Sequence, residues 1–436
     1  MACNPGLCRP EYRARSAWAI LGRPLGAQIG QILYGVARWG SGKNTLITQA
    51  SLSLDLGYHR PPLGAQIGQA KISQWPVGNG PWMQISRETF DEQRRPRFGT
   101  ANPERMQLAF WEWMIRGDDR PLPVDGSIFA QSGFVFRKGI LKSSYGPYRA
   151  RDLFQVPLNR DDGPIWTFDR MGATRTELPD GRVVCVGGEH EDFYDPDFCI
   201  YNDVVVLSPD GRIEIYGYSR EVFPPTDFHT ATLVGERIIL IGCLGYPEER
   251  RPGHTPVYAL DTKEYRLAPF DTTGPVPGWV SSHEATVDTD GVILVKGGNV
   301  IGERDGQQNF RKNCDDYSLE PTTGVCHQLT DRQWRQFSIH RSDHEWFPDE
   351  QSIEPEELFP SDILGAEMID DSEEDSSQLL IRLEGWPVTI KVGSGEIAVI
   401  IQGPVRSEAA IPFVDAVRAR AQAWMQQACV FVEAWR

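Results

Sequence analysis

The sequence lacks the features that mark membrane and secreted proteins. No stretch approaches the roughly 18 apolar residues that a helix needs to cross a bilayer, and no Asn-x-Ser/Thr sequon occurs. Arg9, Arg13, Arg15 and Arg23 interrupt the N-terminal region, where a signal peptide would need an apolar run. We therefore expect a cytoplasmic protein without a membrane segment.

Paired cysteines are also missing. None of the 8 cysteines forms a Cys-x-x-Cys pair. Cys185 lies inside an apolar segment, and Cys243 directly follows a second one. This spacing predicts free thiols in a reducing compartment rather than a disulfide framework or a zinc site. Nothing in the sequence implies a cofactor.

Charge is unevenly distributed along the chain. The net charge of −16 arises mainly in residues 343–375, which contain 14 Asp or Glu and no Lys or Arg. Self-repulsion keeps such a run solvated, so we interpret residues 343–377 as an acidic linker. Residues 1–100 are basic, with 12 Lys or Arg against 5 Asp or Glu, but no basic stripe follows. We therefore expect no nucleic-acid binding.

The first 80 residues offer little to bury. The octapeptide PLGAQIGQ occurs there twice without change, at 24–31 and 62–69. Gly, Gln and Ser dominate the segment, which favours weak order over a packed core. Residues 1–80 are therefore expected to be a weakly ordered or non-native extension.

A 55-residue repeat occupies the middle of the chain. The segments DGRVVCVGG (180–188), GERIILIGC (235–243) and DGVILVKGG (290–298) each open with a two-residue turn, continue as an apolar strand and end at glycine or just past it. A weaker match falls one period upstream, at Asp125-Gly126. Further strand candidates precede and follow each segment, so each period predicts about four short strands. That is the content of one propeller blade.

These segments resemble the kelch family. Kelch blades carry a glycine pair after the second strand, here Gly187-Gly188 and Gly297-Gly298, and the third strand is preceded here by Asn202-Asp203. The resemblance covers roughly half the chain. It implies an all-β kelch-like β-propeller of about four or more blades over residues 81–342, like the central domain of galactose oxidase. The blades would be divergent and of bacterial type, because Cys243 replaces the second glycine of one pair. A solenoid with the same period is the alternative.

The C-terminal residues 378–436 predict a small α+β unit of three strands and a long helix. Strand candidates lie at 379–385, 387–392 and 396–403, and apolar residues at spacings of three and four predict a helix over 408–435. The helix is expected to pack on its own sheet. The alternative is a contact between copies, which would make the protein a homo-oligomer. A second helix is predicted at 104–116.

The candidate functional residues lie in long polar loops that join second to third strands. In a propeller these loops, at 189–199, 244–254 and 299–313, gather on one face, where binding residues are commonly carried. Charges of both signs there suit a protein partner or a polar ligand. The candidate binding residues are His190, Asp192, Asp195, Asp197, Glu248, Glu249, Arg250, Arg251, His254 and Arg304. Glu189, His190 and Asp195 would be the ligands of a metal ion, but their spacing fits no established pattern, so no metal is assigned.

Two histidines stand at matching places in the repeat. His229 and His283 are 54 residues apart, close to the repeat period, and repetition favours a structural role over a catalytic pair. Some kelch-like propellers are enzymes, but the residues of those active sites cannot be matched here. The sequence therefore favours a protein-binding scaffold that is not an enzyme. The alternative is a carbohydrate-active or metal-dependent enzyme that uses the same face.

Overall fold

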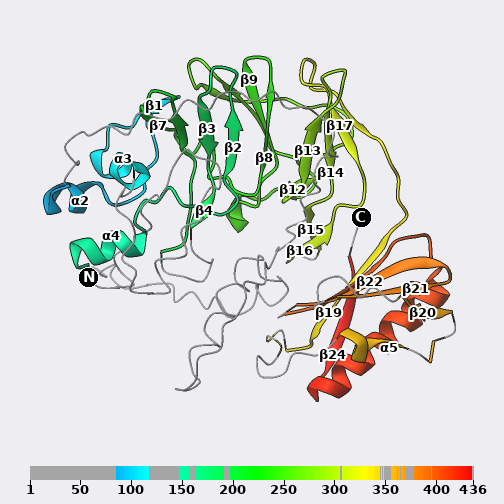
Figure 1. The fold of residues 1–436 in the computed structure, drawn as a ribbon. Coiled ribbons are helices and arrows are strands. Elements are labelled where there is room, and N and C mark those ends of the chain that lie inside the picture. Colours follow the sequence, from blue (N-terminus) through cyan, green and yellow to red (C-terminus); the bar gives the residue numbers. More distant parts are fainter. Residues whose placement is uncertain are drawn as a thin grey trace, which may run out of the picture.

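The computed structural model describes residues 85–116, 147–156, 163–190, 197–304 and 307–343, short pieces between 345 and 369, and residues 378–434 apart from 394. The described part is mostly β, with several antiparallel sheets and a C-terminal helix (Figure 1). No helix in these ranges is long and apolar enough to cross a membrane. The 1–80 extension, the Asp125-Gly126 match and most of the acidic linker lie outside the described residues.

The three repeat segments each form one four-stranded antiparallel sheet, as the period predicted. The first sheet contains β2 (Thr174–Glu177), β3 (Val183–Val186), β6 (Val204–Leu207) and β7 (Ile213–Gly217), with β1 (Glu104–Arg105) added beside β7. The second contains β8 (Thr230–Val234), β9 (Arg237–Ile241), β10 (Val257–Asp261) and β11 (Leu267–Pro269). The third contains β13 (Glu284–Val287), β14 (Ile293–Lys296), β17 (Tyr317–Leu319) and β18 (Cys326–Gln328).

The sheets pack face to face because their central strands are apolar on both sides. In β9, Ile238 and Leu240 join the core shared with the first sheet, whereas Ile239 and Ile241 join the core shared with the third. Side chains alternate between the faces of a strand, so an unbroken apolar run can serve two interfaces. The first strands are also neighbours, with β8 in contact with both β2 and β13.

The two ends of this stack differ. Beyond the first sheet lie α2 (Arg87–Gln93), α3 (Ala109–Arg116) and α4 (Pro147–Phe154), and Trp111 of α3 stacks on Trp166 with ring centroids 4.6 Å apart. The helix predicted at 104–116 is therefore shorter than expected, because residues 104–105 pair with β7 as a strand.

The far face of the third sheet carries mostly polar side chains. Ile293 and Val295 of β14 point toward the second sheet, which leaves Leu294 and Lys296 on the other side. The cross-strand partners on that side are Glu284, Thr286 and Ser318. Three sheets are thus seen in the described residues, and they do not close a ring.

A repeated backbone joint links successive sheets. Gly172, Phe228 and Ser282 occupy equivalent positions just before each first strand, and all three have positive φ angles of 62°, 47° and 52°. The Phe228 amide donates to the Gly172 carbonyl at 2.8 Å, and the Ser282 amide donates to the Phe228 carbonyl at 2.8 Å. The same bond is therefore made at both interfaces.

The two matched histidines tie the first strands together. His229 Nε2 shares a hydrogen bond with Thr174 Oγ1 of β2 at 2.7 Å, and His283 Nε2 shares one with Thr230 Oγ1 of β8 at 2.9 Å. Both rings are buried. This repetition gives them the structural role that the sequence favoured.

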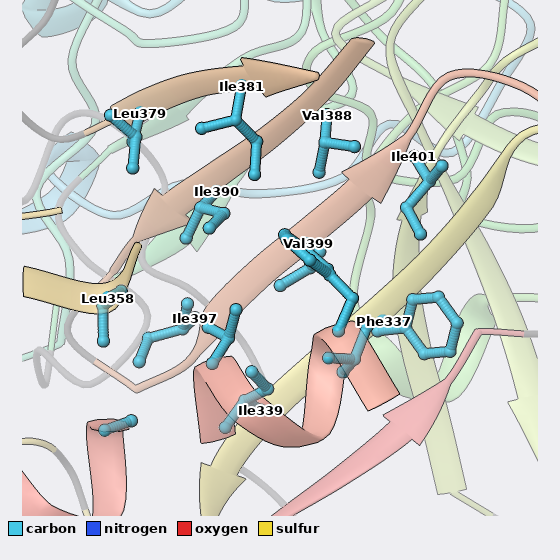
Figure 2. Close-up of a cluster of buried hydrophobic side chains, with 14 of the residues drawn as sticks. Phe337, Ile339, Leu358, Leu379, Ile381, Val388, Ile390, Ile397, Val399 and Ile401 are labelled. Carbon is cyan, nitrogen blue, oxygen red and sulfur yellow. The ribbon is translucent and has the colours of Figure 1, made fainter. Parts of the chain in front are cut away.

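The C-terminal unit is a six-stranded sheet covered on one face by a helix. Its strand order is β20-β21-β22-β23-β19-β24. The strands are β19 (Arg335–Arg341), β20 (Ala366–Met368), β21 (Gln378–Leu383), β22 (Trp386–Val392), β23 (Ile397–Ile401) and β24 (Cys429–Glu433). Apolar side chains from β19, β21, β22 and β23 gather against the helix, α5 (Ser407–Met425) (Figure 2). The unit thus uses strands on both sides of the expected linker.

The helix predicted over 408–435 is wrong in its second half. α5 ends at Met425, because Gln426 takes a left-handed conformation with a φ of 52°. Residues 429–433 then pair with β19 as a strand. The buried helix residues Val414, Val417 and Ala421 face the unit's own core.

Candidate functional site

Elements that join second to third strands gather at one end of the three sheets. In the first sheet the connection contains β4 (Glu189–His190) and β5 (Cys199–Ile200), and in the second it contains the short helix η4 (Pro247–Glu249). In the third sheet the expected loop 299–313 is instead a hairpin of β15 (Asn299–Arg304) and β16 (Gln307–Lys312), which pairs with β12 (Trp279–Ser281). β4, β12, β15 and β16 lie toward the lower end of the sheets in Figure 1. We call this the loop end.

Part of the second connection presents charge to solvent. The Glu248 side chain is 70% exposed, and Arg251 and His254 are exposed. Partial burial and the nearby charge of Arg251 lower the pKa of His254. These three residues offer both an acidic and a basic group at the loop end.

The two residues between them serve the loop itself. Glu249 pairs with Arg220 at 2.6 Å. The Arg250 guanidinium is turned inward, where Nε donates to the carbonyl of Leu244 at 3.0 Å and Nη2 donates to that of Gly245 at 3.0 Å. The predicted charged run 248–251 is therefore half surface and half internal support.

The first connection also uses one predicted residue internally. Asp197 pairs with Arg151 of α4 at 2.5 Å, and both side chains are largely buried. The main chain of His190 pairs with that of Cys199. Three predicted residues have side chains that the structure does not describe: Asp192, Asp195 and Arg304.

A buried pair of carboxyl groups links the first and second sheets at the loop end. Asp227 is fully buried, and its Oδ1 accepts a hydrogen bond from the Gly245 amide at 2.7 Å. Its side chain is also hydrogen bonded to that of Glu189, which is 4% exposed. Burial raises the pKa of Asp227. Since carboxylates only accept hydrogen bonds, a bond between two carboxyl groups requires one proton.

The repeat itself does not require this pair. Glu189 is equivalent to Leu244, and Asp227 is equivalent to Ser281, when the sheets are superposed on their 55-residue period. The joint between the second and third sheets is thus built without a carboxyl at either place. Sequence reasoning missed the pair because the two residues are 38 positions apart. Comparing the repeats position by position would have shown them as departures.

Few other charges lie near the carboxyl pair. Arg250 is the cation whose charge acts on Asp227 and Glu189. Next to Glu189 in β4, His190 interacts with Asp169, whose pKa burial raises. In the described part of the chain, no group of three or more His, Cys, Asp or Glu is placed to hold a metal ion.

The residues that carry the kelch resemblance have structural contacts. Asn202 Nδ2 donates to two main-chain carbonyls of the β7–β8 connection, at 3.0 and 2.7 Å. Asp203 accepts from Trp166 Nε1 at 2.8 Å and from both terminal nitrogens of Arg170. These buried contacts fasten the connection that follows the first sheet.

Comparison with known proteins gives little further guidance. No protein-family model matches the chain, and no curated protein matches it. One similar solved structure is that titled "Structure of YjhT", which is 12% identical with a TM-score of 0.27. The similarity covers 55% of this chain and 66% of that one, just under two thirds. At that TM-score the likeness supports no assignment of fold or function.

Proposed function

We propose that the chain is a divergent kelch-like repeat protein that binds a protein partner through its loop end. One observation carries the proposal: three matched connections from a rigid stack of sheets gather at one end and expose charges of both signs. The internal bonds of Arg250 hold the second connection in place while Glu248 and Arg251 remain at the surface. Fixed charges of this kind suit recognition of a complementary protein surface.

The propeller arrangement is part of this proposal. Its support is that β8 contacts both β2 and β13, as the innermost strands of neighbouring blades do. The polar far face of the third sheet favours an array that ends there over one that continues with another packed blade.

A pair of neutralised variants tests the loop end. Glu248→Gln with Arg251→Gln removes two exposed charges without touching the buried contacts of Glu249 and Arg250. We expect a captured partner to bind this variant at least about tenfold more weakly. Partners would be captured by cross-linking in native cells, identified by mass spectrometry and measured as purified proteins by calorimetry.

The matched control lies at the opposite end of the same sheet. Glu264 and Arg266 follow β10, pair at 2.9 Å and are about 70% and 69% exposed. Their change to Gln should leave binding unaltered. Equal binding by the loop-end variant and wild type would overturn the assignment of this face.

One observation favours a second candidate, a carbohydrate-active or metal-dependent enzyme at the same end. The Glu189–Asp227 pair is absent from the neighbouring joint, and paired carboxyls serve acid–base chemistry in many hydrolases. Turnover of an aryl glycoside panel, lost in Asp227→Asn, would favour this candidate. Turnover that Asp227→Asn retains would exclude the pair from catalysis.

A further inference from the structure

We propose that Glu189 and Asp227 hold one shared proton at neutral pH and act as a pH-dependent latch between the first two sheets. The latch lies at the loop end used in the proposed function, but it is a property of the chain alone. It can therefore be tested without a partner.

The geometry fixes both carboxyls to different elements. Asp227 precedes β8, and its Oδ1 and main-chain oxygen accept from the amides of Gly245 and Leu244 at 2.7 and 3.0 Å. No N–H donor reaches Asp227 Oδ2 in the described residues. Glu189 belongs to β4 of the first sheet, and its hydrogen bond to Asp227 bridges the sheets. A proton on one carboxyl is what makes that bridge attractive rather than repulsive.

Charge balance also favours one proton. Arg250 contributes a single buried positive charge, which one carboxylate neutralises and two would exceed. The other acidic groups on this connection do not alter the count: Glu248 is largely in solvent, and Glu249 is paired with Arg220. The buried Cys243 thiol stays neutral, because burial raises its pKa.

On the side of the first sheet, the facing titratable groups are those beside β4. His190 follows Glu189 and interacts with the buried Asp169. A charge change on His190 is therefore met first by Asp169.

Proton loss would open the joint. The proton passes to water as pH rises, and the two resulting carboxylates repel each other across the interface. Because the folded chain holds this proton above the pH at which the unfolded chain releases it, stability falls as pH rises above about 4 toward the folded pKa. The connection 189–200 would then separate from 244–250 and change the shape of the loop end.

Amide variants give the test. In Glu189→Gln or Asp227→Asn the amide replaces the protonated carboxyl, and one carboxylate remains to balance Arg250. We expect the fall in urea midpoint that wild type shows between about pH 5 and about pH 8 to be at least halved in each single variant. The double variant leaves Arg250 without a counter-charge, so its midpoint should lie below wild type throughout.

Infrared spectroscopy of the intact protein gives a readout that does not depend on unfolding. Wild type should show the C=O stretch of a protonated carboxyl at neutral pH, and that band should be lost in each single variant. The proposal is overturned if the band is unchanged in either variant. It is equally overturned if both single variants keep the full wild-type pH slope or if the double variant is as stable as the singles. Loss of partner binding with an intact latch would count against the proposed function alone.

Discussion

Asp203 is the centre of the most buried ion pair in the first sheet. Its side chain and that of Arg170 are 5% and 3% exposed, and Trp166 donates a third hydrogen bond. Asp203→Ala would leave a buried guanidinium without its counter-charge. We expect the free energy of unfolding to fall by about 3 to 5 kcal/mol, measured by urea denaturation.

The control is an aspartate–arginine pair in solvent. Asp210 and Arg212 pair at 2.7 Å but are 56% and 69% exposed. Asp210→Ala should leave the unfolding midpoint within error of wild type. Similar losses in both variants would mean that burial does not govern the contribution of Asp203.

The two tying histidines predict a loss of stability in acid. Burial lowers the pKa of His229 to about 3, helped by the charge of His283, and burial lowers that of His283 to about 4. The unfolded chain therefore binds protons below about pH 6.5 that the folded chain refuses, so stability falls as pH falls. Each histidine should cost about 2 kcal/mol between about pH 6.5 and about pH 5.

Replacing both histidines by Gln checks this sign. The variant should lose part of the acid dependence of its urea midpoint, because Gln does not titrate. An acid slope equal to that of wild type would assign the dependence to other groups.

At the residue scale, the sequence predicted positions better than contacts. The matching places of His229 and His283 were readable from the period, and their structural role followed. The inward turn of Arg250 was not readable, because its partners are main-chain carbonyls that no side-chain pattern encodes. The carboxyl pair was missed because contact across an interface depends on how two sheets pack.

Among the elements, α3 closes the first sheet through one aromatic contact. Trp111 is fully buried and stacks on Trp166 at an interplanar angle of 6°. Trp111→Ala should lower the free energy of unfolding by about 3 to 5 kcal/mol through the cavity it leaves. Trp111→Phe keeps an aromatic ring there and should cost clearly less. Thermal unfolding of both variants decides, and equal values would show that the stack does not matter.

The strands were easier to predict than their neighbours. β3, β9 and β14 stand out because continuous apolar runs followed by glycine suit strands buried on both faces. The polar hairpin of β15 and β16 gave no such signal. The helix over 408–435 was overextended because Phe431 keeps a helical spacing, although it belongs to a strand that β19 completes from 90 residues upstream.

For the whole molecule, the stack is protected unequally along its length. The first and second sheets bury both faces, whereas the third shares one apolar core and turns a polar face outward. End repeats of such arrays open most readily. We expect amide hydrogens of β13 and β14 to exchange faster than those of β3 and β6, measured by mass spectrometry. Equal protection would indicate cover on the far face.

The number of sheets was beyond the period alone. Four or more blades were expected, but a period does not say where an array ends. The histidine ties do: Ala173 stands where the first sheet would need a histidine, and Glu284 stands where the third would need a threonine. Within the described residues the ladder of ties therefore has two ends.

The left-handed residue before each first strand has a wider consequence. Glycine, phenylalanine and serine all occupy that place, and the joint is made by main-chain atoms in each case. Selection on such a joint acts on a backbone shape and leaves the side chains free to drift. A protein built this way can keep its architecture long after its repeats have stopped looking alike, and its kinship is then recorded in hydrogen bonds rather than in letters.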